Sequence, residues 1–443
     1  MKKAAFYTLG CKVNQYESEA LKDLFRQEGY RVVPFAEKAD VYVINSCTVT
    51  HLSDGKSRQA VRRAARQNPE AVVAVIGCYP QVAPEEAAEI PGVDILLGTG
   101  NRRELPALVE KARRGHKLNL VREKGAGEAF EDLPWPGEAG RTRAFLKIQE
   151  GCQEYCTYCI IPHARGSLRS QEPGEVLNRV AAIRDKGYGE LVLTGTHLGA
   201  WGRDLVPPRT LSSLLYQIQE EGAPGRVRLS SLEPVDVDEG LLRALKDIPR
   251  ICRHLHIPLQ SGSDEILQAM ARPYRQEDFR RLAAGLRDLD PRMALSTDII
   301  VGFPGEEDRH FQETLSFVRE MAFSRLHVFK FSPRRGTEAA GLPGRVPPRV
   351  MGKRAEILRA LGKELAQEYA EKFLHTTLDV LLEKPLPGGN MEGLTEHYLR
   401  ARLKGDSALK SRMVPVFITG AREGLLYGEL RKQPGLPPVT SRE

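Results

Sequence analysis

The sequence predicts an α/β protein of three units: an N-terminal parallel α/β sheet, a central open barrel of parallel strands, and a small C-terminal β-barrel. Strand-like and helical segments alternate through residues 1–118 and again through residues 141–371, a pattern typical of parallel sheets. Residues 372–435 contain short strands and turn signals instead. The chain has 443 residues, of which 41% are hydrophobic and 28% charged, as in ordinary globular proteins.

The N-terminal unit is predicted from apolar strands that alternate with helices. We expect its strands at residues 4–9, 41–44, 71–76 and 94–97. We expect its helices at residues 18–27, 56–67 and 103–113. Residues 119–140 are predicted to link this unit to the next.

Three cysteines follow successive strands of this sheet. Cys11, Cys47 and Cys78 each come one to three residues after a strand end, and the carboxyl ends of parallel strands meet at one edge, where ligands bind. Three thiols suit an iron–sulfur cluster with one open iron better than a closed zinc site. The alternative is three buried core cysteines. The odd total of seven cysteines argues against a disulfide framework.

A second cysteine set, Cys152, Cys156 and Cys159, has C-x3-C-x2-C spacing directly after a predicted strand at residues 144–149. Three thiolates from one tight loop can hold three corners of an iron–sulfur cubane and leave the fourth iron free. A zinc site is the alternative, with His163 as its fourth ligand.

The central unit is predicted from six strands. The first is the strand at residues 144–149, directly before the second cysteine set, and five more follow it. We expect them at residues 190–193, 226–230, 254–259, 294–301 and 326–331. Helical patterns separate several of them, at residues 175–186, 276–289 and 311–321. Six strand–helix units form an open or partial TIM-like barrel, whose chemistry lies at the carboxyl ends of the strands.

The C-terminal unit is predicted after a long helix at residues 349–373. Its strands are expected at residues 378–382, 398–403, 414–418 and 425–430. Turn signals stand at residues 387–389 and at Gly393. Short strands in a segment of this size predict a small β-barrel.

Basic residues gather on the helix that follows Cys47. Arg58, Arg62 and Arg66 recur at every fourth position, so they share one face, and Lys56 lies beside them with no acid in the group. Like charges this close repel unless a partner neutralises them. The formal net charge of +7 permits an anionic partner. These residues therefore predict an RNA-binding face.

The sequence predicts a cytoplasmic protein with no membrane partner. No apolar run approaches the ~20 residues that span a bilayer. Lys2 and Lys3 precede an apolar stretch of only about seven residues, at the lower limit for a signal peptide.

The motifs together resemble the radical S-adenosylmethionine (SAM) methylthiotransferases over essentially the whole chain. The resemblance rests on C-x3-C-x2-C and on residues 8–14 (TLGCKVN), 45–50 (NSCTVT), 56–58 (KSR), 76–78 (IGC), 256–263 (HIPLQSGS), 297–306 (TDIIVGFPGE) and 331–337 (FSPRRGT). Residues 392–400 and 417–421 are similar to the TRAM domain, an OB-like RNA-binding module. In that module Arg400, Arg402, Lys404, Lys410 and Arg412 are predicted to supply phosphate contacts.

The resemblance implies two 4Fe-4S clusters, one on each cysteine set, and SAM bound at the open iron of the second. It implies that SAM cleavage yields a radical which removes a substrate hydrogen, and that a methylthio group from the first cluster replaces it. Cofactor contacts are expected near strand ends: Tyr158, Gly195, Thr196, Glu233, Gln260 and Asp298. Cys252 is predicted to be a structural thiol.

Within this family, residues 9–18 (LGCKVNQYES) look most like enzymes that act on N6-threonylcarbamoyladenosine 37 of tRNA. The isopentenyladenosine branch usually has YGCQMN here, and the branch that modifies a ribosomal-protein aspartate has LGCPKN; both stay as alternatives. The implied partners are the anticodon loop of ANN-decoding tRNA and an electron donor such as flavodoxin or ferredoxin. A rival of a different class is a non-catalytic RNA-binding metal protein.

Overall fold

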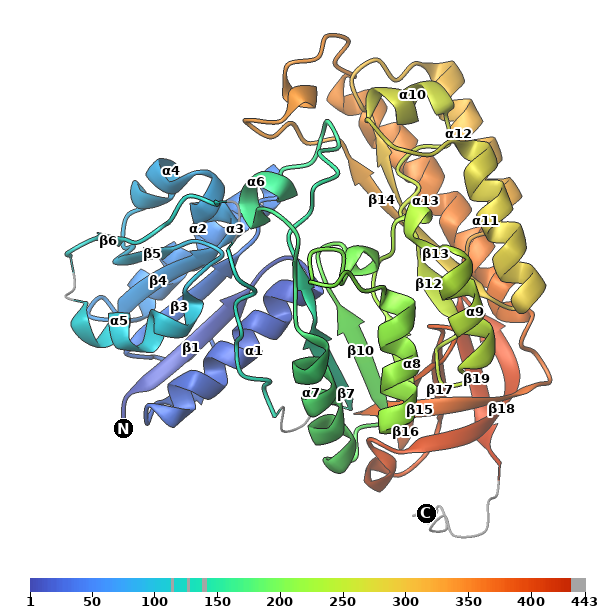
Figure 1. Cartoon of the computed structure of the whole chain (residues 1–443), viewed down its shortest axis with the longest axis horizontal. Coiled ribbons are helices and arrows are strands. Elements are labelled where there is room, and N and C mark those ends of the chain that lie inside the picture. Colours follow the sequence, from blue (N-terminus) through green and yellow to red (C-terminus); the bar gives the residue numbers. More distant parts are fainter. Residues whose placement is uncertain (113–114, 126–127, 138–141, 432–443) are drawn as a thin grey trace.

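Two lobes lie side by side, an N-terminal α/β lobe and a larger lobe that combines the half-barrel with a C-terminal barrel (Figure 1). The computed structural model describes residues 1–112, 115–125, 128–137 and 142–431. Parts of the predicted linker, Arg113 of the third predicted helix, and the end of the predicted C-terminal unit lie outside these ranges. No helix within them is long and apolar enough to cross a membrane.

The N-terminal lobe is a six-stranded parallel sheet in the order β2-β1-β3-β4-β5-β6, with helices on both faces. The strands are β1 (Lys3–Thr8), β2 (Arg31–Val33), β3 (Val41–Ser46), β4 (Val72–Gly77), β5 (Ile95–Leu97) and β6 (Leu118–Asn119). The helices are α1 (Lys12–Gln27), α2 (His51–Gln67), α3 (Cys78–Val82), α4 (Pro84–Ala88), η1 (Arg102–Glu104) and α5 (Leu105–Lys111). One apolar cluster packs α1 and α5 on one face, and a second packs α2, α3 and α4 on the other.

Two helices of this lobe begin earlier than the sequence predicts. Helix α1 starts at Lys12 instead of residue 18, directly after Cys11. Helix α2 starts at His51 instead of residue 56, and the Thr50 side chain caps it by accepting a hydrogen bond from the backbone of Ser53. The first turns of both helices contain mainly polar residues, so the helical spacing of apolar residues, on which the prediction depends, begins only later. As a result, each helix carries the chain directly away from a cysteine loop.

The central unit is an open half-barrel of six parallel strands. Two three-stranded sheets, β11-β10-β7 and β12-β13-β14, are joined by the bridges Val227–Ile251 and Ser231–His256. The strands are β7 (Arg143–Lys147), β10 (Glu190–Thr194), β11 (Arg226–Leu229), β12 (His254–His256), β13 (Ala294–Val301) and β14 (Arg325–Lys330). Short β8 (Gln149–Glu150) pairs with β9 (Arg169–Ser170) beside the second cysteine set.

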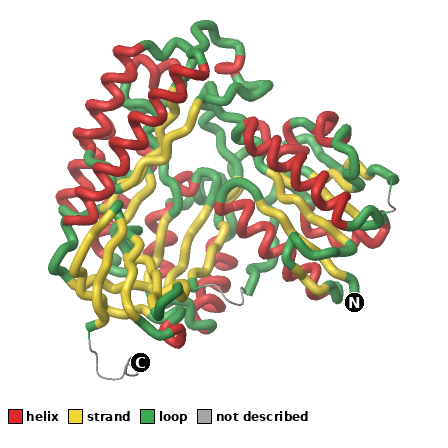
Figure 2. The backbone as a smooth tube through the Cα atoms, turned by 180° about the vertical axis from the view of Figure 1, so that it is seen from behind, coloured by secondary structure: helices red, strands yellow, loops and turns green. Residues whose placement is uncertain are grey.

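Helices cover the convex side of the half-barrel, with the long ones forming an outer wall seen from behind (Figure 2). They are α7 (Pro173–Asp185), α8 (Leu211–Glu221), α9 (Glu239–Asp247), α10 (Asp264–Ala269), α11 (Gln276–Leu289), α12 (Asp308–Met321) and α13 (Pro348–Glu371), with α6 (Ile161–Arg165) and single turns η2 (Leu198–Ala200), η3 (Pro234–Asp236) and η4 (Glu338–Ala340) in the loops. The main apolar core fills the space between these helices and the strands.

The C-terminal unit is a closed five-stranded barrel in the order β15-β16-β17-β19-β18. The strands are β15 (Thr377–Leu386), β16 (Asn390–Thr395), β17 (Arg400–Lys404), β18 (Met413–Arg422) and β19 (Leu425–Leu430), with the turn η5 (Ser407–Leu409). The prediction of a turn at Gly393 is wrong. Gly393 lies inside β16, where a Cβ atom would come within 2.5 Å of the Leu381 carbonyl oxygen on β15, so glycine permits the close strand pairing.

Candidate active site between two cysteine sets

The first three cysteines leave the sheet at one edge, as the strand ends predict. Cys11 follows β1, Cys47 follows β3, and Cys78 begins α3 directly after β4. A Cβ atom on Gly10, whose φ is +96°, would lie 3.0 Å from the Cys47 sulfur, so the first two loops are in close contact. The Asn14 amide donates to the carbonyl oxygens of Leu9 and Ser46 at 2.8 and 2.9 Å and fixes these loops together.

These thiols are electrostatically coupled and mostly buried. Burial, opposed by the charge of Arg165 and supported by the neighbouring Cys47 and Cys11, raises the pKa of Cys78 to about 12. Burial likewise raises the pKa of Cys47. Thiolates in such surroundings need a strong positive partner. A soft metal centre, for which three thiols are the preferred donors, fits this set.

The second cysteine set forms a loop between β8 and α6. Gly151, with φ +83°, opens the loop, and a Cβ atom there would overlap the Ser167 carbonyl oxygen. The Cys156 sulfur accepts a hydrogen bond from the Arg272 guanidinium at 3.0 Å. Burial raises the pKa of Cys159 to about 12 and that of Cys156 above its usual value. This set also offers three thiols, the donor number of a cluster with one open iron.

The candidate zinc ligand His163 is exposed on α6. His197 lies closer to the loop: its Nδ1 is 3.8 Å from the Cys152 sulfur and its Nε2 is 2.7 Å from an Asp236 oxygen. Within the described ranges, no three His, Cys, Asp or Glu side chains converge to hold a single metal ion.

A cavity of about 170 Å³ lies beside Cys159 of the second cysteine set, between the half-barrel and the segment that follows Cys47. The N-terminal lobe contributes Val49 and Thr50, which follow Cys47, and the half-barrel contributes the opposite wall. That wall is lined by Tyr158, Cys159, Ile160, Ile161, Gln260, Asp298, Ile300, Phe329, Lys330, Phe331 and Ser332. A substrate in this cavity would therefore contact residues next to both sets.

Three of the six predicted cofactor residues, Tyr158, Gln260 and Asp298, line this cavity. Glu233 forms an ion pair with Arg272, which links it to the Cys156 loop. Gly195 and Thr196 follow β10, and a Cβ atom on Gly195 would lie 2.7 Å from the Gln149 side-chain oxygen. The sequence reasoning missed Arg272 and His197, because no motif marks them.

The two lobes are joined by a buried network of charges. Arg165, at the end of α6, donates to Glu17 on α1 at 2.5 Å and to Glu150 on β8 at 2.6 Å. Arg102 also pairs with Glu17 at 2.5 Å, and Lys147 pairs with Glu150 at 2.9 Å. All five side chains are at most 2% exposed. The helix after Cys11 and the strand before Cys152 are thereby fixed to each other.

A second junction holds the segment after Cys47. The Arg334 guanidinium, in the loop after β14, donates to Thr48 Oγ1 at 2.6 Å and pairs with Asp54 at 2.7 Å. The backbone of His51 donates to Ser332 Oγ at 3.2 Å. These contacts position the wall of the cavity that the N-terminal lobe supplies.

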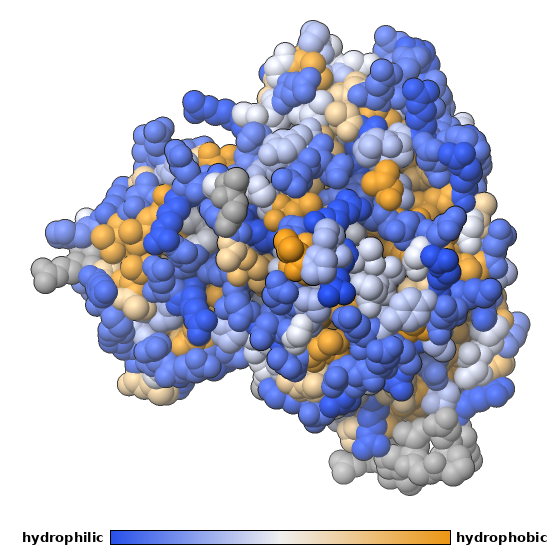
Figure 3. Space-filling view, viewed as in Figure 1, coloured by the Kyte–Doolittle hydropathy of each residue, from blue (hydrophilic) through white to orange (hydrophobic). Residues whose placement is uncertain are grey.

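Three of the nine predicted RNA-binding residues have acidic partners within the chain. Arg58 pairs with Glu86 of α4 at 3.0 Å, so an acid from another helix reaches the basic face of α2. Arg400 and Arg402 both pair with Glu392, at 2.7 and 3.0 Å. The other six are exposed: Lys56, Arg62, Arg66, Lys404, Lys410 and Arg412. The face in Figure 3 is mainly hydrophilic, with apolar side chains in small separate patches.

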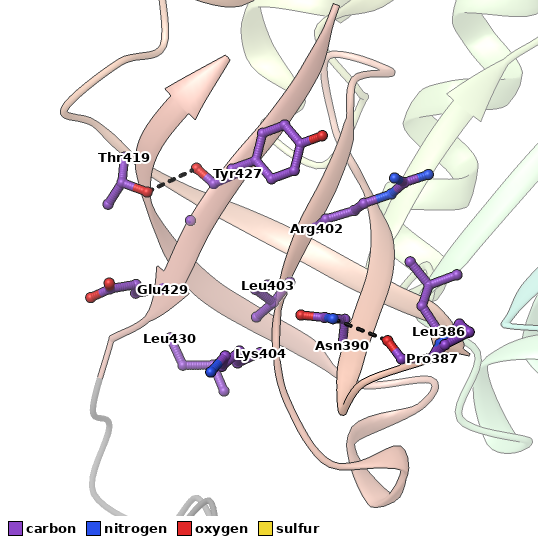
Figure 4. Close-up of a pocket in the computed structure, with 11 residues that line it drawn as sticks. Leu386, Pro387, Asn390, Arg402, Leu403, Lys404, Thr419, Tyr427, Glu429 and Leu430 are labelled. Carbon is purple, nitrogen blue, oxygen red and sulfur yellow. Dashed lines mark hydrogen bonds between the residues drawn. The ribbon is translucent and has the colours of Figure 1, made fainter. Parts of the chain in front are cut away.

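A broad depression of about 790 Å³ lies on the C-terminal barrel. Arg402 on β17 and Tyr427 on β19 are register partners, so their side chains share one side of the sheet (Figure 4). Lys404 also lines the depression, and Tyr427 is 38% exposed. An exposed aromatic ring among cations is a surface on which bases stack. The sequence reasoning identified the basic residues but not Tyr427.

Comparisons with known proteins agree with this arrangement. Residues 3–98 match the uncharacterized protein family UPF0004, and residues 146–318 match the radical SAM superfamily. The chain is 42% identical to threonylcarbamoyladenosine tRNA methylthiotransferase MtaB of Bacillus subtilis (strain 168), over 97% of this chain and 96% of that protein. It is 35% identical to tRNA-2-methylthio-N(6)-dimethylallyladenosine synthase of Moorella thermoacetica, over 96% and 97%.

Among solved structures, the radical SAM methyltransferase TsrM from Kitasatospora setae, with cobalamin and a [4Fe-4S] cluster bound, is similar in fold. Its TM-score is 0.58 at 14% identity, over 76% of this chain and 77% of that one. The full-length similarity to the B. subtilis enzyme goes further than fold. From these relatives and from the two cysteine sets, we conclude that the chain belongs to the radical SAM methylthiotransferase family.

Proposed function

We propose that this enzyme methylthiolates C2 of N6-threonylcarbamoyladenosine 37 in tRNA. The observation that carries the proposal is one cavity that is lined by Cys159 of the second cysteine set and by Val49 and Thr50, which follow Cys47 of the first. The B. subtilis relative, named for this substrate, supports the choice of nucleoside. A non-catalytic RNA-binding protein would have no need for a cavity that joins segments of two such sets.

In this proposal, Cys11, Cys47 and Cys78 ligate one 4Fe-4S cluster, and Cys152, Cys156 and Cys159 ligate the other. Bound SAM supplies the methyl group and, through its reductive cleavage at the second cluster, the radical chemistry. Tyr158, Gln260 and Asp298 bind SAM from the cavity wall. Glu233, Gly195 and Thr196 bind it from neighbouring loops.

The chain's own contribution is to hold and enclose the reactants. Arg272 orients the Cys156 ligand by a hydrogen bond and keeps Glu233 in place. The Arg165 and Arg334 junctions fix the distance between the cysteine sets, because their partners Glu17 and Asp54 lie on the helices that follow Cys11 and Cys47. A fixed separation provides the proximity that a radical transfer between bound groups needs.

The proposed tRNA surface combines both lobes. Lys56, Arg62 and Arg66 contact the backbone near the cavity, together with Arg58. Tyr427, Arg402 and Lys404 bind a more distant part of the tRNA on the C-terminal barrel, with Arg400 beside them.

The target is the anticodon loop of ANN-decoding tRNA, the electron donor is a flavodoxin or ferredoxin, and the enzyme works in the cytoplasm. Its domains are residues 1–118, 141–371 and 372–435, with a linker at 119–140.

The proposal is tested by deleting the gene and analysing tRNA nucleosides by mass spectrometry. We expect loss of 2-methylthio-N6-threonylcarbamoyladenosine and accumulation of its precursor. Loss of the isopentenyl derivative instead would assign the chain to the branch of the M. thermoacetica relative. An unchanged nucleoside profile, with altered ribosomal-protein mass, would point to the third branch.

Cluster assignment is tested by iron analysis of single variants. The anaerobically reconstituted protein should hold about eight irons per chain, and Cys156→Ala or Cys47→Ala should each reduce this to about four. Cys156→Ala should abolish deoxyadenosine formation, whereas Cys47→Ala should stop methylthio transfer but retain some SAM cleavage. Cys252→Ala is the matched control, since this buried thiol belongs to neither cysteine set. Zinc in place of iron would contradict the assignment.

A further inference from the structure

Lys12, the residue after Cys11, reaches from the N-terminal lobe into the concave side of the half-barrel. Its ammonium lies 6.0 Å from the ring centre of Tyr398, in the turn between β16 and β17 of the C-terminal barrel. The Tyr398 ring in turn stacks on His254 of β12 at 4.5 Å and lies under the guanidinium of Arg228 on β11. All three units of the protein therefore meet at Lys12.

The concave side carries more positive than negative charge at this point. Glu190 accepts hydrogen bonds from Arg226 and Arg228 at 2.6 and 2.8 Å. Glu383 accepts one from Arg143 at 2.6 Å. Within the described ranges, these carboxylates already have arginine partners, and no ion pair forms at Lys12. A half-buried ammonium in such surroundings favours an anionic ligand.

The same concave surface leads to the candidate active-site cavity. Asp298 lines the cavity, and its Oδ1 lies 3.3 Å from His256 Nε2 and 3.5 Å from His327 Nδ1. His256 and His254 both contact Ser296 Oγ, at 3.0 and 2.9 Å, and His254 stacks on the Tyr398 ring beside Lys12. A continuous row of side chains therefore runs from the cavity wall to Lys12. A nucleoside held in the cavity can extend a substituent toward Lys12.

We propose that Lys12 binds the carboxylate of the threonylcarbamoyl substituent and so selects this nucleoside. The inference rests on the proposed function. The threonyl part of the substituent carries one carboxylate, whereas a dimethylallyl group is apolar and uncharged. A half-buried cation binds the carboxylate favourably, and beside a dimethylallyl group it would have no anionic partner, so one residue supplies both attraction and rejection.

The test measures binding of anticodon stem-loops to the cluster-loaded protein without SAM. Three probes are used: one with N6-threonylcarbamoyladenosine, one with its carboxyl methyl ester, and one with unmodified adenosine. We expect the wild type to bind the free carboxylate roughly 10- to 100-fold more tightly than the ester, the range for a hydrogen bond between charged groups. Lys12→Gln should bind all three probes about equally, and Lys12→Arg should restore the preference.

Lys22→Gln is the matched control, because it removes the same charge from the same helix, where Lys22 pairs with Glu19. It should retain the preference. Equal loss of affinity for all probes in Lys12→Gln, with the preference intact, would show a structural role and overturn the inference while the proposed function stands. A wild type that shows no preference for the free carboxylate, and that modifies the isopentenyl nucleoside instead, would overturn both.

Discussion

Single arginines lie beside the cysteine loops and compensate their charge. Arg272 donates to Cys156, to Tyr274 and to Glu233, and Arg165 acts on Cys78 from the end of α6. A cation next to a sulfur ligand stabilises the more negative, reduced form of a cluster. We therefore expect these residues to tune the clusters that the cysteines are proposed to hold.

Replacing Arg272 by Met should make reduction of the second cluster harder. Loss of the positive charge and of the hydrogen bond to Cys156 should shift the midpoint potential negative by roughly 60 mV, equivalent to about tenfold in a one-electron equilibrium. Spectroscopically monitored redox titration measures it. Arg275→Met, at an exposed position three residues on, should leave the potential unchanged. Equal potentials in wild type and Arg272→Met would contradict this role.

At the scale of elements, the cysteines lie in short loops between strands and helices. The side chains that hold these loops in place come from other elements. The start of α2 is held by its own Thr50 cap and by Arg334 from the loop after β14. Asp54, in the first turn of α2, is almost completely buried and accepts from Thr48 as well as pairing with Arg334. The segment after Cys47, which forms one wall of the cavity, is thus held in place by a contact between the two lobes.

Arg334→Met should loosen the start of α2 without unfolding the lobe. Removing a hydrogen-bonded charge from buried Asp54 costs about 1.5–3 kcal/mol locally. Amide hydrogen exchange of residues 48–57 should therefore accelerate by roughly 10-fold or more. The neighbouring exposed Arg335→Met is the control. Uniform acceleration throughout the lobe would instead indicate global destabilisation.

At the scale of the whole molecule, buried charge pairs join the three units. The network around Glu17 joins the N-terminal lobe to the half-barrel. Glu190 and its arginine partners join the half-barrel to the C-terminal barrel, because Arg228 also donates to the carbonyl oxygens of Thr395 and Glu396. Buried ion pairs of this kind are directional, so they fix the relative orientation of the units.

Glu17→Gln should uncouple the lobes. It leaves Arg102, Arg165 and Lys147 with one carboxylate fewer in a buried site, a loss of about 3 kcal/mol or more. Differential scanning calorimetry should resolve the N-terminal lobe as a separate, earlier transition. Glu19→Gln, which pairs with Lys22 on the same helix, should retain the wild-type profile. An unchanged profile for Glu17→Gln would show that the network does not couple the lobes.

The second junction predicts a pH dependence. Burial raises the pKa of Glu190, but Arg228 and Arg226 outweigh it and lower the pKa to about 2. The folded-state pKa is therefore below the unfolded value near 4.5, so the stabilisation is complete above that value and is lost as the pH falls toward 2. The loss amounts to about 3 kcal/mol. Glu190→Gln should show a shallower fall of Tm between these pH values, and parallel curves would contradict the assignment.

The sequence by itself determined the chemistry and the order of the units. Cysteine spacing places three thiols in one loop, and strand ends bring three more to one sheet edge, because local periodicity and chain connectivity suffice for both. The alternation of strands and helices likewise predicted the half-barrel. Among its errors were the early starts of α1 and α2, and the turn expected at Gly393, whose role depends on a neighbouring strand.

Only the tertiary structure decided which charged residues act at the site. Arg272, Arg334 and Glu17 meet partners far away in the sequence, and no periodicity marks such pairs. Arg58 and Glu86 likewise neutralise each other across two helices, which changed the predicted RNA-binding face. Lys12 is the clearest case of a residue whose surroundings come from distant parts of the sequence. Its neighbour is a predicted cluster ligand, but the surface that its ammonium faces is built by strands and a turn more than 100 residues later.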